Sequence, residues 1–170
     1  MHYQTMKRMI YFTYLLFLAS SFLSWNPVAA EGPTPPPFEL TSLEGERFTN
    51  EEMSGKVTLF IFWASWCGVC RQELPQAHLL HKKMAGRPFQ IVAVGFRDSE
   101  NNIQNYVKDH PDVFSFPVYY DKGDRVASQF GAVATPTLFL FDKKGQLVVP
   151  YRGGGLFEHP KFQRTLLGIL

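Results

Sequence analysis

The chain has 170 residues, of which 45% are hydrophobic and 15% aromatic. This composition can bury one sizeable core, and it excludes a disordered or collagen-like protein. Removing residues 1–30 would leave 15 basic against 15 acidic residues, so the formal charge of +2 belongs to the N-terminus. A neutral domain without a basic stripe predicts that nucleic acid is not a partner.

Residues 1–30 have the layout of an export signal. Lys7 and Arg8 precede the apolar run 9–23, and residues 28–30 (Val-Ala-Ala) offer a cleavage site after Ala30. The run is shorter than the roughly 20 residues that span a bilayer, which favours cleavage. The alternative is an uncleaved signal anchor that tethers the protein to the membrane through residues 9–23. In either case we expect a protein of the periplasm or another extracytoplasmic space.

The rest of the chain divides into a Pro-rich spacer and one domain. Residues 31–37 contain four prolines, which favour an extended spacer, and the domain is expected over 38–170. A β-hairpin is expected from 38–40 and 47–49, followed by a helical turn through Met53. The later elements are expected, in order, as strand 57–63, helix 71–84, strand 89–96, a helix capped by Ser99, strand 116–120, helix 125–130 capped by Asp124, hairpin strands 137–141 and 147–151, and helix 158–170.

This order of elements predicts an α/β fold. Strand, helix and strand over residues 57–96 imply a parallel crossover, whereas the strands after residue 136 form an antiparallel hairpin. Together they predict a central mixed β-sheet flanked by helices, with an N-terminal β-hairpin.

Two cysteines, Cys67 and Cys70, carry the strongest functional signal. A structural disulfide usually closes a longer loop than two residues, so a catalytic pair is the better interpretation. The pair lies where a strand passes into a helix, and there the unpaired N–H groups and the helix dipole stabilise negative charge. We therefore expect an uncovered Cys67 sulfur with a pKa below the roughly 8.5 of a free thiol. Cys67 would be the nucleophile and Cys70, one turn further in, the resolving thiol.

Residues 62–70, FWASWCGVC, resemble the FWAxWCxxC signature of thioredoxins. Three further features resemble the TlpA and ResA type of exported thioredoxin-like protein: Glu73-Leu74-Pro75, a helix-containing central insert at 99–120, and the segment Ala134-Thr135-Pro136-Thr137. The resemblance covers residues 38 to 170. It implies a thioredoxin fold and thiol–disulfide oxidoreductase activity with no cofactor and no metal site.

The resemblance also implies roles for particular residues. A cis peptide before Pro136 would place Thr135 and Pro136 against the cysteines, where their backbone groups would bind an extended substrate. Glu73 would relay the proton of Cys70. Trp66 is expected to contact substrate. Ile61 stands where cytoplasmic thioredoxins carry a buried aspartate, so the relay falls on Glu73 by default.

Several functions remain open at this stage. The first is a reductase that delivers electrons to disulfides of other exported proteins, such as apocytochrome c, and is recharged by a membrane electron donor. A net disulfide-forming oxidant is the alternative within the same fold, because direction depends on redox potential. A module that binds copper through Cys67 and Cys70 is an alternative from another class. A peroxidase is disfavoured because the Thr-x-x-Cys pattern is missing.

Two other features have simpler interpretations. His78 and His81 share a helix face but lack further ligands at suitable spacing, so we expect them to face solvent. Residues 153–155 are three consecutive glycines without the lysine or the flanking elements of a phosphate-binding loop. They are expected to form a flexible turn.

Overall fold

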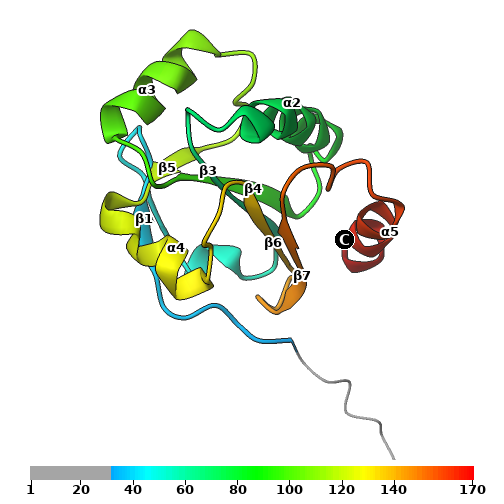
Figure 1. Cartoon of the computed structure of the whole chain (residues 1–170). Coiled ribbons are helices and arrows are strands. Elements are labelled where there is room, and N and C mark those ends of the chain that lie inside the picture. Colours follow the sequence, from blue (N-terminus) through cyan, green and yellow to red (C-terminus); the bar gives the residue numbers. More distant parts are fainter. Residues whose placement is uncertain (1–31) are drawn as a thin grey trace, which may run out of the picture. The chain divides into compact units, whose positions relative to one another are not determined.

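The structure is a computed structural model that describes residues 32–170. A five-stranded mixed sheet forms its centre (Figure 1). Across the sheet the strands are β5 (Val118–Tyr120), β4 (Phe89–Gly95), β3 (Val57–Trp63), β6 (Thr137–Phe141) and β7 (Leu147–Arg152). β3, β4 and β5 are parallel, and β6 and β7 run antiparallel to their neighbours. The predicted mixed sheet is confirmed.

The predicted hairpin and helices are present as well. The hairpin consists of β1 (Glu39–Thr41) and β2 (Arg47–Thr49). The helices are η1 (Glu51–Met53), α2 (Gly68–Lys83), α3 (Glu100–Asp109), η2 (Lys122–Asp124), α4 (Arg125–Phe130) and α5 (Pro160–Ile169). α3 and β5 form the expected central insert. Helix α2 begins at Gly68, three residues earlier than predicted, so the second cysteine lies inside the helix.

Strand β3 is buried on both faces and separates two apolar clusters. Leu59 and Ile61 belong to the cluster that includes residues of α2, α3 and α5. Phe60 and Phe62 belong to the opposite cluster, which includes the hairpin and α4. This alternation follows from the two-residue period of a strand, and it explains why the continuous run 57–63 is apolar at almost every position. Helices and hairpin thus cover both faces of the sheet.

The folded unit begins before the predicted boundary at residue 38. Residues 32–37 have no regular secondary structure, as their prolines predict, but they are held against the domain. Leu147 N–H donates to the carbonyl of Pro33 at 2.9 Å. The Asn50 amide donates to the carbonyls of Pro35 and Pro36 and accepts from Phe38 N–H at 2.9 Å. Most of the expected spacer is therefore attached to the domain.

The predicted export signal at 1–30 and the tether at 9–23 lie outside the described residues. Between residues 32 and 170, none of the helices has the length and apolar character needed to cross a bilayer.

The helix caps agree with prediction at one position and differ at another. Ser99 caps α3, since its Oγ accepts from Asn102 N–H at 3.2 Å. The prediction that Asp124 caps α4 is wrong. Asp121 fills that role by accepting from the N–H groups at the start of the helix, at 3.1 and 2.7 Å. Asp124 instead has a left-handed backbone (φ 55°) and its carboxylate accepts from Arg97 N–H at 2.8 Å.

The two edges of the sheet differ. At the β5 edge, Ser42 next to the hairpin makes an antiparallel bridge to Tyr119. At the other edge, β7 carries Pro150, which has no N–H to donate.

Gly95 in β4 is packed tightly against α3. A Cβ at this position would lie 2.7 Å from Ile103 Cδ1 and 2.8 Å from its Cγ1. We expect Gly95→Ala to lower the free energy of unfolding by about 1–3 kcal/mol through overpacking, measured by urea denaturation. Ile103→Val removes the nearest carbon and should cost about 0.5–1.5 kcal/mol alone. In the Gly95→Ala background, Ile103→Val should cost less or restore stability. If the losses in unfolding free energy of the two single variants simply add in the double variant, the contact is contradicted.

Candidate active site

Cys67 lies at the N-terminus of α2, as predicted. β3 ends at Trp63, the chain turns, and Cys67 becomes the N-cap of the helix with an extended backbone (φ −79°, ψ 107°). Its Sγ accepts from Cys70 N–H at 3.1 Å, so the sulfur occupies the position of an N-capping oxygen. The two cysteines are joined by a disulfide. The structure therefore represents the oxidised form of the pair.

The sulfur atoms are more covered than expected. Cys67 retains 5% of its accessible surface and Cys70 none. The expectation of an uncovered Cys67 is wrong for this form, because the disulfide and the Cys70 N–H hold its sulfur against the first turn of α2. Cys67 is the more accessible of the two cysteines. An attacking thiol can reach the bond only from the Cys67 side.

Asp98 holds the turn that precedes Cys67. Its Oδ2 accepts from Ser65 N–H at 2.8 Å and from Ser65 Oγ at 2.6 Å. Its Oδ1 accepts from Ser99 N–H and from the Asn102 amide. Partial burial acts to raise the pKa of Asp98, but these hydrogen bonds outweigh it and hold the pKa below the usual 3.8. Nothing in the sequence pattern pointed to Asp98, which lies 33 residues from Ser65.

Trp66 is exposed and yet fixed in orientation. Its side chain is 57% exposed, and its Nε1 donates to the Arg97 carbonyl at 3.0 Å. The Arg97 guanidinium donates in turn to the Val133 carbonyl at 2.7 Å, and Arg97 has a left-handed backbone (φ 52°). Trp66 is therefore held as an exposed apolar side chain directly before Cys67. The link through Arg97 was not foreseen.

Thr135 and Pro136 lie at the same end of the sheet as the cysteine turn. The register between β3 and β6 pairs Phe62 with Thr137, so the start of β6 lies beside the end of β3. The peptide bond between Thr135 and Pro136 is cis, as the resemblance implied. Pro136 is buried and Thr135 is half-buried.

Glu73 lies one helical turn beyond Cys70 and is only 7% exposed. Its Oε1 accepts from Gly155 N–H at 2.6 Å. Its Oε2 is buried and has no hydrogen-bond partner among residues 32–170. A buried carboxylate oxygen without a partner is costly, and such an oxygen is a candidate for proton exchange. Gly155 was not foreseen either, because the triglycine segment resembled an ordinary turn.

The histidines of α2 do not face solvent as expected, because both are half-buried. His81 Nδ1 lies 3.0 Å from Ser115 Oγ, and its ring meets Phe116 edge-on. Burial lowers the pKa of His81, and neighbouring His78 lowers it further. In the described part of the chain, no group of three or more His, Cys, Asp or Glu residues is placed to hold a metal ion.

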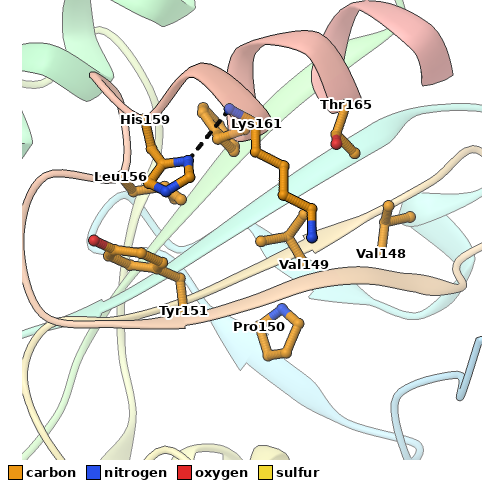
Figure 2. Close-up of a pocket in the computed structure, with 9 residues that line it drawn as sticks. Val148, Val149, Pro150, Tyr151, Leu156, His159, Lys161 and Thr165 are labelled. Carbon is orange, nitrogen blue, oxygen red and sulfur yellow. Dashed lines mark hydrogen bonds between the residues drawn. The ribbon is translucent and has the colours of Figure 1, made fainter.

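The cysteine pair lines none of five pockets found within residues 32–170. The largest of these, about 360 Å³, is between β7 and α5 (Figure 2). It is lined by Val148, Val149, Pro150, Tyr151, Leu156, His159, Lys161, Phe162 and Thr165. A disulfide that is reached at its Cys67 edge, outside these cavities, suits a protein substrate better than a small molecule.

Comparison with known proteins identifies the family. Residues 32–149 match the model of the AhpC/TSA family. The chain belongs to this family. ResA of Bacillus thuringiensis subsp. konkukian, a thiol–disulfide oxidoreductase, is 31% identical over 122 residues, which cover 72% of this chain and 69% of ResA.

Solved structures agree with this assignment. A putative thiol:disulfide interchange protein DsbE from Chlorobium tepidum superposes with a TM-score of 0.74 at 27% identity, covering 82% of this chain and 96% of that one. A putative thioredoxin from Neisseria meningitidis gives 0.72 at 31% identity, covering 82% and 91%. This member of the AhpC/TSA family therefore has the thioredoxin fold and is a thiol–disulfide oxidoreductase.

Asp98→Asn should loosen the turn before Cys67, because an amide cannot accept from all of its present donors. We expect a loss of about 1–2 kcal/mol in the free energy of unfolding at neutral pH. Since the pKa of Asp98 is lowered in the folded state, its stabilisation is complete above the unfolded value of 3.8 and is lost as pH falls through the folded pKa.

The measurement is urea denaturation of both proteins across this pH range. The difference between wild type and Asp98→Asn should be constant above about pH 5 and should shrink in acid. A difference that stays the same at all pH values would contradict this account of Asp98.

Proposed function

We propose that the protein is an exported dithiol reductase that transfers electrons to disulfides of other extracytoplasmic proteins, as in cytochrome c maturation. The proposal includes a membrane electron donor that restores the dithiol after each turnover. It also includes a periplasmic or comparable location, reached through residues 1–30 as a cleaved signal or as an anchor.

The observation that carries the proposal is the position of the Cys67 sulfur at the start of α2. The Cys70 N–H that donates to Sγ in the disulfide is placed to donate to a thiolate after reduction. Stabilisation of the thiolate makes Cys67 a nucleophile near neutral pH. Cys70, fully buried behind it, is protected from solvent and suited to resolution.

The surroundings of the disulfide favour a polypeptide substrate. Three of the six exposed large apolar side chains in the described residues are near the site: Trp66 (57% exposed), Val69 (44%) and Val133 (56%). Trp66 and Val69 flank Cys67 in the sequence, and Val133 shortly precedes the cis-proline. An extended client can place apolar side chains on them while its backbone pairs beside Thr135.

The proposed reduction proceeds in two steps. The Cys67 thiolate attacks one sulfur of the client disulfide, forms a mixed disulfide and releases the other client sulfur as a thiolate, which takes a proton from solvent. Cys70 then transfers its proton to Glu73, and its thiolate attacks the Cys67 sulfur. The second client thiolate leaves and is protonated. Two electrons have passed to the client, and the Cys67–Cys70 disulfide seen in the structure is formed.

The same geometry supports the reverse reaction, so a net oxidant is the second candidate. The disulfide is a state through which a reductase and an oxidant both pass, and the putative thiol:disulfide interchange protein among the structural neighbours is compatible with either direction. Redox equilibrium with glutathione distinguishes the two. A reductase should equilibrate below about −180 mV, and a value well above this would identify an oxidant.

Cys70→Ala should trap clients, because the mixed disulfide on Cys67 then has no resolving thiol. Expressed in the native host, this variant should accumulate adducts that run as higher-mass bands on non-reducing gels and disappear with reductant. Cys67→Ala is the matched control and should trap far less, since Cys70 is fully buried. Equal trapping by the two variants, or none by Cys70→Ala, would contradict the proposed exchange.

A further inference from the structure

The loop Gly153–Gly155, between β7 and α5, is fixed against the active site by its backbone. Figure 2 shows Tyr151 before this loop and Leu156 after it. Three hydrogen bonds hold it: Gly153 N–H to the Pro136 carbonyl at 2.9 Å, Tyr151 OH to the Gly154 carbonyl at 2.8 Å, and Gly155 N–H to Glu73 Oε1 at 2.6 Å. The loop thus connects the cis-proline segment to α2.

Each glycine of the loop is needed for a physical reason. Gly153 and Gly155 have φ of 90° and 88°, in the region that favours glycine. A Cβ on Gly154 would lie 2.8 Å from Val69 Cγ1 and 3.2 Å from Glu73 Oε1. The prediction of a flexible turn is therefore wrong, because the loop is closely fitted to α2.

The loop leaves the two oxygens of Glu73 in different states. Oε1 is occupied by the Gly155 N–H, whereas Oε2 has no partner among residues 32–170. Glu73 and Cys70 are three residues apart on one helix, so their side chains lie on the same face. Oε2 is thus the free acceptor on the face that carries the resolving cysteine.

We propose that the Gly153–Gly155 loop is the positioning element of Glu73 in the exchange reaction. The Gly155 N–H holds Oε1, and the missing side chain of Gly154 leaves room for the carboxyl group beside Val69. Oε2 is then the oxygen that takes up and returns the proton of Cys70. This inference rests on the proposed thiol–disulfide exchange. Gly154 and Gly155 act through Glu73 and do not touch the reacting sulfurs.

Gly154→Ala tests the loop, because the new methyl group is too close to both Val69 Cγ1 (2.8 Å) and Glu73 Oε1 (3.2 Å), so both side chains must shift. We expect the rate of resolution of the mixed disulfide, followed by stopped flow with the full chain, to fall roughly tenfold to a hundredfold. The pH dependence of that rate should change as well. Gly168→Ala in α5 is the matched control, since a Cβ there meets no heavy atom within 4 Å. It should keep the wild-type rate and pH profile.

Glu73→Gln separates positioning from a purely structural role. Glutamine keeps an acceptor for the Gly155 N–H but cannot take up a proton, so Gly154→Ala should cause no further loss in this background. An undiminished further loss would overturn the inference. So would a wild-type pH profile in folded Gly154→Ala.

Val69→Ala provides a background in which the methyl group has more room. The Val69 Cγ1 atom, which would lie 2.8 Å from the new methyl carbon, is removed, and the contact of that carbon with Glu73 Oε1 remains. If Gly154→Ala alone does not fold, the pair Val69→Ala/Gly154→Ala should fold and show the altered pH profile relative to Val69→Ala; an unaltered profile overturns the inference. Absence of any exchange in the wild type would instead overturn the proposed function, and this inference with it.

Discussion

The chemistry of this protein depends on the junction by which β3 passes into α2. β3 is buried on both faces and cannot shift without moving both apolar clusters. Asp98 ties the following turn to the end of the neighbouring strand, so the point at which the helix starts is fixed. Cys67 becomes the N-cap as a result, and its sulfur accepts from the Cys70 N–H in the first turn of the helix.

The other parts of the site reach this junction from distant parts of the chain. The β3–β6 register brings the cis-proline to the same end of the sheet, and the triglycine loop follows from β7. The Gly153 N–H donates to the Pro136 carbonyl and so joins two of these segments, and the Gly155 N–H donates to the Glu73 carboxylate on α2. The site is therefore a composite of four chain segments, held together by backbone groups together with the side chains of Asp98, Arg97 and Glu73.

The sequence predicted what depends on periodicity and local pattern. The order of elements, the buried run 57–63, the position of Cys67 and the Ser99 cap all follow from residues close in sequence, and the cis-proline followed from the family resemblance. Contacts between distant residues were not predictable. Asp98, Arg97 and Gly155 act on residues more than 30 positions away, and their own neighbours carry no motif. Asp121 replaced Asp124 as a cap because the backbone of Asp124 turns left-handed, which a sequence pattern does not reveal.

The two edges of the sheet have a consequence for a protein whose proposed clients bind through extended segments. An extended client strand could add to any open sheet edge and remain bound there, or several copies could join edge to edge into aggregates. Pro150 has no N–H, so it interrupts the hydrogen-bond donors along β7, and Ser42 is paired with Tyr119 at the β5 edge. Pairing of a client strand with either edge of the sheet is thereby disfavoured, so a client can be released once its disulfide has been exchanged.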